Sequence, residues 1–184
     1  MEHNDLLQAR ELIIEAMGKQ SSFWGLGKTV GEIFAVLYLS TVPLTLAEIA
    51  ENLKVTKGNV SVSVRGLERL GMVRRTWQRG DRKVYFEAET DLWKVSRNVL
   101  SQRQKPEFDY SFSLVEKSLQ MAKKSQPTPE QEEIVRRLNS IVFFYKQLDS
   151  LVAAVLKTDP AHLPALANFI SGMARVKGRR SDQV

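Results

Sequence analysis

Apolar residues recur along most of this 184-residue chain at the three- and four-residue spacings that are typical of amphipathic helices. The first pattern predicts a helix over residues 5–18, followed by a loop over 21–27. A second apolar stripe predicts a helix over residues 29–39. Thr45 and Glu48 have the spacing of a capping box, so a short third helix is expected to begin directly after them.

Residues 56–69 admit two interpretations. Alternating valines and serines favour a β-strand, whereas Val60, Val64 and Leu67 keep helical spacing up to Gly71, a residue type that is common where helices end. Because the helical spacing covers the longer stretch, we predict a helix here.

The two segments that follow alternate between apolar and polar residues and are rich in strand formers. They cover residues 72–78 and 82–89 and are separated by Arg-Gly-Asp, which predicts a β-hairpin. The order helix, turn, helix, hairpin is that of a winged helix-turn-helix domain.

The chain after the hairpin is predicted to be helical. Thr90 and Asp91 cap a helix that reaches Pro106, which either kinks this helix or restarts it. Another long helix, over residues 129–157, carries apolar residues at alternating four- and three-residue spacing, the heptad pattern by which helices pack along a seam. This seam is compatible with packing inside one protomer or between two protomers of a dimer. Its residues are Ile134, Leu138, Ile141, Tyr145, Leu148, Val152 and Val155.

These elements divide the chain into four parts. An N-terminal helix and loop (1–28) precede the winged helix-turn-helix domain (29–89). A helical dimerisation and effector region (90–176), ending in a helix over 162–176, precedes a basic flexible tail (177–184). The predicted fold class is therefore mainly α, with a small β-hairpin wing and a C-terminal helical dimerisation region.

The composition argues against most kinds of catalysis. There is no cysteine, and the two histidines, His3 and His162, are far apart in the sequence, so neither a metal nor a cofactor is expected. Gly-Leu-Gly-Lys-Thr at 25–29 resembles part of a phosphate loop, but Ser22 stands where that loop needs its first glycine. Neither a signal peptide nor a membrane span is evident, so a soluble, cytoplasmic protein without enzymatic activity is expected.

Positive charge is concentrated in one segment. Residues 54–83 contain nine Lys or Arg residues and two acidic residues, a net charge of +7, whereas the whole chain has a net charge of +6. The rest of the chain is therefore almost neutral. Such a concentration is expected of a surface that binds phosphates.

The helix predicted over residues 56–69 combines small residues with long hydrogen-bond donors, as a helix that enters the major groove requires. Arg65 is suited to guanine, Asn59 to adenine or a phosphate, and Val62 to a thymine methyl group. The alternative is an ordinary solvated helix face. The candidate contacts are Lys57, Gly58, Asn59, Ser61, Val62 and Arg65.

The hairpin tip carries cations that suit the negative potential of a minor groove, although a solvated turn is the alternative. Asp81 is expected to pair with Lys83 or Arg82 and so to hold the shape of the tip. Lys28, at the start of a helix, either contacts a phosphate or only shapes the loop before it. The candidate contacts in the tip are Arg79, Arg82 and Lys83.

Residues 20–100 resemble the winged-helix domain of the GbsR-like branch of the MarR-type transcriptional regulators. The helix-turn-helix is common to many regulators, whereas Trp-Gly and Gly-Glu-Ile within FWGLGKTVGEIF (23–34), together with RGDRK (79–83) and TDLWK (90–94), are similar to this branch. The resemblance implies a homodimer that places one recognition helix per protomer in the major groove of a pseudo-palindromic operator. It also implies repression of nearby genes and, in some members, release by a small ligand such as choline.

We therefore expect a sequence-specific DNA-binding transcriptional regulator, a homodimeric repressor. Its expected partners are double-stranded DNA, a second copy of itself and a small-molecule effector whose identity the sequence does not indicate. The alternatives are a winged-helix protein–protein adaptor and a non-specific DNA-binding protein. The charge of +7 in residues 54–83 argues against an adaptor, which has no need of it.

Overall fold

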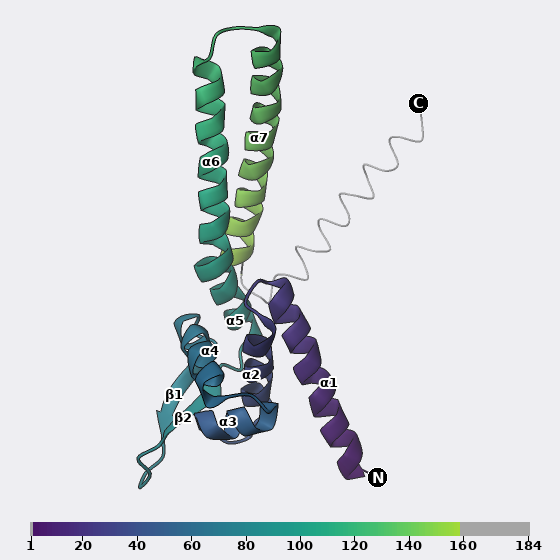
Figure 1. The fold of residues 1–184 in the computed structure, drawn as a ribbon, viewed down its shortest axis with the longest axis vertical. Helices are drawn as coiled ribbons and strands as arrows, with labels where there is room; N and C mark the ends of the chain where they lie inside the picture. Colours follow the sequence, from purple (N-terminus) through teal and green to yellow (C-terminus); the bar gives the residue numbers. More distant parts are fainter. Residues whose placement is uncertain (1, 159–184) are drawn as a thin grey trace. The chain divides into compact units, whose positions relative to one another are not determined.

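The computed structural model describes residues 2–158, with side chains from residue 4 onward. The chain forms an N-terminal and a C-terminal unit, which divide between Arg103 and Gln104 (Figure 1). The helix predicted over 162–176, the tail predicted over 177–184 and His162 lie outside the described residues.

The N-terminal unit begins with two helices in close contact, α1 (Glu2–Phe23) and α2 (Lys28–Tyr38). The second agrees with the prediction, but α1 is longer than predicted and continues through Ser21. The hydroxyl of Ser21 donates a hydrogen bond to the carbonyl oxygen of Gly27 (2.8 Å), which closes a shorter turn than the predicted loop. At Gly31 the helices lie so close that an added Cβ would be 2.2 Å from a carbonyl oxygen of α1.

The helix-turn-helix consists of α3 (Leu46–Leu53) and α4 (Lys57–Arg69), which confirms the prediction of a helix over the Val-Ser repeat. The capping box is also confirmed. The hydroxyl of Thr45 accepts a hydrogen bond from the N–H of Glu48 (3.3 Å), and the Glu48 carboxylate accepts one from the N–H of Thr45 (2.7 Å). The core beneath these helices is apolar. Its most deeply buried side chains are Ile33, Phe34, Ile49, Val60, Val64 and Leu67.

The predicted hairpin is formed by β1 (Val73–Trp77) and β2 (Val84–Ala88) in an antiparallel register that pairs the first residue of each strand with the last residue of the other. Leu44, just before α3, exchanges two backbone hydrogen bonds with Phe86 (2.9 and 2.7 Å). This bridge ties the segment before the helix-turn-helix to the base of the wing.

The chain leaves the hairpin through α5 (Leu92–Val99), whose first N–H groups donate to the carboxylate of Asp91. A π-helical turn (Leu100–Gln104) separates it from α6 (Lys105–Lys124). Pro106 lies in the first turn of α6, where a helix does not need the N–H that proline lacks. The regular α-helix therefore ends at Val99 and restarts at Lys105, directly before Pro106.

The C-terminal unit is an antiparallel hairpin of α6 and α7 (Pro129–Lys157), which run side by side (Figure 1). The ring of Tyr145 on α7 stacks against Phe108 and Phe112 of α6, with ring centroids 5.1 and 5.5 Å apart. No helix within residues 2–158 is both long enough and apolar enough to cross a membrane.

The predicted heptad seam of α7 separates into two apolar stripes. The inner stripe, which includes Tyr145, is partly buried on the side that faces α6, whereas the outer stripe is largely exposed, with Phe144 at 58 %. The predicted seam runs between the two and takes residues from both. The inner stripe consists of Val135, Leu138, Val142, Tyr145, Val152 and Leu156. The outer stripe consists of the half-buried Leu148 and the exposed Ile134, Ile141, Phe144, Leu151 and Val155.

Candidate nucleic-acid interface

The orientation of α4 follows from its cap and its buried stripe. Thr56 caps the helix by accepting a hydrogen bond from the N–H of Asn59 (3.3 Å). The buried valines and Leu67 then turn the opposite face outward, where Val62 is 64 % exposed and Arg65 is also exposed. An exposed valine flanked by polar and cationic residues is a suitable surface for contact with base edges.

Two of the nine cations in residues 54–83 are neutralised inside the domain. Arg74 pairs with Glu87 across the hairpin (2.6 Å), and Arg75 pairs with Glu68 of α4 through two hydrogen bonds (2.6 and 2.9 Å). These hydrogen bonds raise the pKa of both arginines. Within the described part of the chain, six of the remaining cations form no ion pair. They are Lys54, Lys57, Arg65, Arg69, Arg79 and Arg82.

The wing tip is held in shape by Asp81. Its carboxylate accepts hydrogen bonds from the hydroxyl of Tyr85 (2.7 Å) and from the N–H of Lys83 (2.9 Å), whereas the Lys83 amine is 4.0 Å away. The hydrogen bond from Tyr85, followed by that from Lys83, lowers the pKa of Asp81. The sequence predicted Lys83 or Arg82 as the partner, and Lys83 is one of the two partners found. The other, Tyr85, was not predicted, because its position beside Asp81 depends on the register of the hairpin. Arg79 and Arg82 at the tip are therefore exposed on an ordered turn.

Three of the six residues of α4 predicted to contact DNA lie beside the wing. A groove of about 660 Å³ lies between the start of α3, α4 and the hairpin, and Lys57, Ser61 and Arg65 of α4 line it together with Lys83. The Nε–H of Arg65 donates to the carbonyl oxygen of Ser61 (3.2 Å), which holds the guanidinium along the helix. The other candidates, Gly58, Asn59 and Val62, lie outside this groove.

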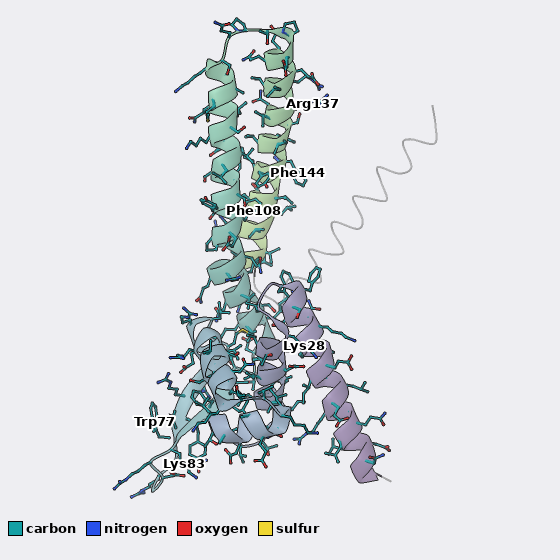
Figure 2. All side chains as sticks on the ribbon, viewed as in Figure 1. Lys28, Trp77, Lys83, Phe108, Arg137 and Phe144 are labelled. Atoms are coloured by element: carbon teal, nitrogen blue, oxygen red, sulfur yellow. The ribbon has the colours of Figure 1, made fainter. Side chains whose placement is uncertain are left out.

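Lys28 lies apart from this basic surface (Figure 2). Its amine is 3.3 Å from the carboxylate of Glu32. The turn before it is shaped by Gly25 and Gly27, which have φ values of 71° and 93° that favour glycine. The segment that precedes this turn is the helix α1 and not a strand, so the context of a phosphate loop is absent.

Two residues that the sequence analysis did not select share the basic surface. Arg69 lies one heptad after Val62 on α4, and both line the same shallow depression. Trp77, at the end of β1, is 67 % exposed. A helical-wheel projection could have found Arg69, whereas the exposure of Trp77 depends on where the sheet leaves the core.

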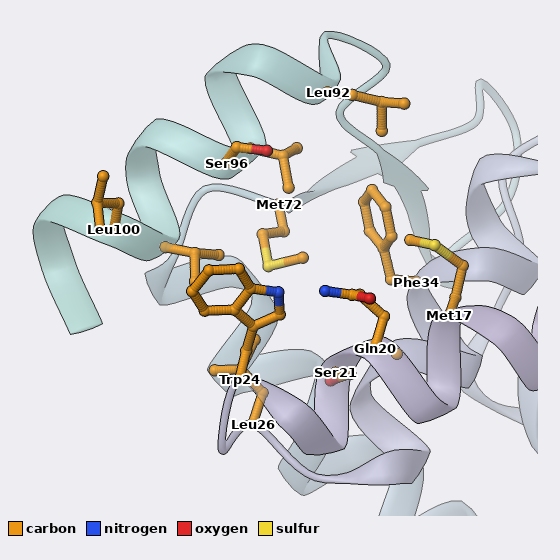
Figure 3. Close-up of a pocket in the computed structure, with 13 residues that line it drawn as sticks. Met17, Gln20, Ser21, Trp24, Leu26, Phe34, Met72, Leu92, Ser96 and Leu100 are labelled. Carbon is orange, nitrogen blue, oxygen red and sulfur yellow. The ribbon is translucent and has the colours of Figure 1, made fainter. Parts of the chain in front are cut away.

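A separate cavity of about 340 Å³ lies between α1, α2 and α5 (Figure 3). Its walls are apolar apart from the amide of Gln20, which points into it, the indole nitrogen of Trp24, and the hydroxyls of Ser21 and Ser96. None of the charged residues that the structure describes lines it. The apolar residues of the wall are Met17, Trp24, Leu26, Phe34, Met72, Leu92, Val95, Val99 and Leu100.

The helix-turn-helix, the hairpin and the basic surface that they carry define a winged helix-turn-helix protein. Residues 25–83 match the family model described as MarR family, and the chain therefore contains a MarR-family helix-turn-helix domain, as its sequence led us to expect.

Two curated relatives from Bacillus subtilis (strain 168) are similar to this chain. The HTH-type transcriptional repressor GbsR is 28 % identical over 143 residues, which cover 78 % of each protein. The HTH-type transcriptional repressor OpcR is 26 % identical over 87 residues, 47 % of each protein. A crystal structure of a transcriptional regulator superposes with a TM-score of 0.57 at 19 % identity, covering 80 % of this chain and 95 % of that one, which supports the fold.

Proposed function

We propose that this protein is a sequence-specific, DNA-binding transcriptional repressor that acts as a homodimer on a pseudo-palindromic operator. The observation that carries the proposal is the clustering of unpaired cations on α4 and on the wing tip of a winged helix-turn-helix domain. Repression is inferred from the two relatives, which are named as repressors.

In the proposed complex, α4 lies in the major groove and the wing reaches the neighbouring minor groove. Arg65 reads base edges near the end of the groove between α4 and the wing, and Val62 contacts a thymine methyl group. The backbone N–H groups at the start of α4 and Lys57 contact phosphates, as do Arg79 and Arg82 of the tip.

The test is selection of bound sequences from a random duplex library by the purified protein. An enriched inverted repeat with half-sites about one helical turn apart supports the proposal. Salt-dependent binding without enrichment would instead indicate a non-specific DNA-binding protein. Absence of binding even at low salt would indicate a protein–protein adaptor.

Substitutions then separate base contacts from phosphate contacts. Arg65→Ala is expected to cost about 1–3 kcal/mol and to relax the preference at one base position. Arg82→Ala should weaken binding to all duplexes alike and reduce the slope of log K against log salt by about 1. Lys19→Ala is the matched control, because it removes one charge from α1, outside the basic surface. If both arginine variants bind like the control, the assigned surface is incorrect.

The dimer is proposed to form through the outer stripe of α7. Ile141, Phe144 and Leu151 have the spacing of a seam, and all three are exposed in the C-terminal hairpin. An apolar stripe along one helix can pack on the same stripe of a second copy about a two-fold axis.

Adjacent phenylalanines provide a matched pair of variants for this interface. Phe144 belongs to the outer stripe and is 58 % exposed, whereas Phe143 is 66 % exposed but points about 100° away around the helix. Phe144→Asp should yield monomers in sedimentation equilibrium, and Phe143→Asp should leave dimers intact. A dimer that survives Phe144→Asp but not Phe143→Asp would place the interface elsewhere.

The cavity between α1, α2 and α5 is the proposed effector site. Because its walls are mainly apolar and the described residues that line it carry no charge, it suits an uncharged, mainly apolar molecule with one polar group for the amide of Gln20. These lining residues offer no carboxylate to a quaternary ammonium ion. Occupation of the cavity would press on Met72, which connects α4 to β1, and so alter the spacing between the recognition helix and the wing.

The neutral dye N-phenyl-1-naphthylamine tests this assignment. It should fluoresce in the presence of the wild-type protein and lower its affinity for DNA. Ser96→Phe, which fills the cavity, should abolish both effects while leaving DNA binding in place. Equal dye binding by the two proteins would show that the dye occupies another place.

A further inference from the structure

The wing carries an apolar pair that the fold does not require. Trp77 is 67 % exposed and its cross-strand partner Val84 is 38 % exposed. Figure 2 shows Trp77 projecting from the hairpin. The indole of tryptophan has one of the largest apolar surfaces of any side chain, so leaving it exposed to water is unfavourable. Its position on a charged wing is therefore explained if a binding partner covers it.

The strand alternation fixes the face on which this pair lies. Val73, Arg75 and Trp77 point to one face of the hairpin, together with their partners on β2. Val73 and Phe86 are buried beneath α4, and Arg75 reaches across to Glu68 of α4. Trp77 and Val84 therefore continue this α4-facing surface outward, beyond the edge of the core.

The pair lies between the two elements that would enter the DNA grooves. Val84 and Lys83 line the groove of about 660 Å³ whose other walls are α4 and the start of α3. In the opposite direction, residues 78–83 form the tip with its arginines. An interface that places α4 in the major groove and the tip in the adjoining minor groove must straddle the sugar–phosphate strand that separates these grooves.

We propose that Trp77, supported by Val84, packs its indole ring on a deoxyribose of this separating strand. The inference rests on the proposed function. The indole would contact the apolar face of the sugar, which every nucleotide presents. This contact would therefore contribute to affinity without any preference for a base.

Geometry favours the sugar over a base. Trp77 and Val84 form the last pair of the strand ladder, and the tip residues 78–83 lie beyond them in a turn that the N–H of Asp81 closes on the carbonyl oxygen of Gln78 (3.2 Å). A tip that enters the minor groove, which is about 7.5 Å deep, therefore places Trp77 at the edge of that groove, against the backbone. The cations of the tip would fix the flanking phosphates and so hold the sugar against the ring.

The test compares Trp77→Ala and Trp77→Phe with the wild-type protein on the operator and on an unrelated duplex, over a range of salt concentrations. Trp77→Ala should lose about tenfold in affinity for both duplexes, with the slope of log K against log salt unchanged because no charge is removed. Trp77→Phe should recover most of the loss. Trp93→Ala is the control, since Trp93 is 51 % exposed on α5, outside the basic surface.

Fluorescence supplies an independent measurement. The protein has three tryptophans, so Trp24→Phe together with Trp93→Phe leaves Trp77 as the sole reporter. Its emission should shift and become protected from acrylamide when DNA binds.

The outcomes are distinguishable. If the wild-type protein binds no DNA, the proposed function fails. If it binds DNA while Trp77→Ala binds equally well and the emission of Trp77 does not respond, only this inference is overturned. A loss confined to the operator would also overturn it, because that result would identify a base contact.

Discussion

Gly31→Ala should destabilise the N-terminal unit, although glycine-to-alanine changes within helices usually stabilise. Gly31 lies in α2 against α1, and an added Cβ would be 2.2 Å from the carbonyl oxygen of Met17 and 2.5 Å from the Cβ of Ser21. Real Cβ atoms essentially never come closer than 3.0 Å to such neighbours. Because the obstructing oxygen belongs to the backbone, no rotamer change relieves the clash, and α1 must withdraw from α2 as a whole.

The magnitude follows from two opposing terms. Overpacking costs about 1–3 kcal/mol, and a backbone obstruction belongs at the upper end of that range. Alanine in place of a helical glycine returns up to about 1 kcal/mol. The net loss in free energy of unfolding should therefore be about 2 kcal/mol. Gly66→Ala in α4 is the matched control, since no atom lies within 4 Å of the added Cβ, and it should stabilise by about 0.5–1 kcal/mol.

Urea unfolding followed by tryptophan fluorescence is the appropriate assay. All three tryptophans, Trp24, Trp77 and Trp93, belong to the N-terminal unit, so the signal reports on this unit alone. With an m-value on the order of 1.5 kcal/mol/M, Gly31→Ala should lower the midpoint by about 1.3 M. A midpoint equal to that of the wild-type protein, or above it, would refute the close packing of α1 on α2.

Three further predictions concern local interactions. Thr45→Ala breaks the capping box of α3 and should cost about 1 kcal/mol, measured in the same urea assay; an unchanged midpoint would contradict it. Hydrogen bonds from two neighbouring arginines lower the pKa of Glu133 from 4.5 to about 2. The contribution of Glu133 to stability should therefore be present above pH 4.5 and lost as the pH falls to about 2. The difference in Tm between the wild-type protein and Glu133→Gln should shrink over this pH range. A constant difference would argue against the pairing. Tyr85→Phe should raise the pKa of Asp81 toward its ordinary value, because the hydrogen bond from Tyr85 is the largest cause of its lowering. NMR titration of the carboxyl group measures this pKa, and an unchanged value would contradict the prediction.

Features that depend on a few neighbouring residues were predictable from the sequence. The capping box at Thr45, the end of α4 at Gly71 and the hairpin follow from short-range hydrogen bonding and from the conformational freedom of glycine. The interpretation of the Val-Ser repeat was decided by periodicity, because a helix buries Val60, Val64 and Leu67 together whereas a strand does not. The location of positive charge along the chain was equally evident.

The distribution of that charge in space was decided by the tertiary structure. Arg74 and Arg75 lie between the unpaired Arg69 and Arg79 in the sequence, yet the register of the hairpin and its packing on α4 pair them with Glu87 and Glu68. The length of α1 likewise depends on the hydrogen bond of Ser21 to Gly27, a contact that a periodicity cannot reveal.

Burial was the other quantity that only tertiary packing decided. The single heptad seam predicted for α7 becomes an inner stripe, which includes Tyr145, and an outer stripe, which includes Phe144, because a broad apolar face exceeds what one neighbouring helix can cover. The cavity beside Gln20 and the exposure of Trp77 likewise result from how much of each apolar surface the neighbouring elements cover. Sequence patterns specify which side of an element is apolar, whereas the amount of that side removed from water depends on the shape of every element packed against it.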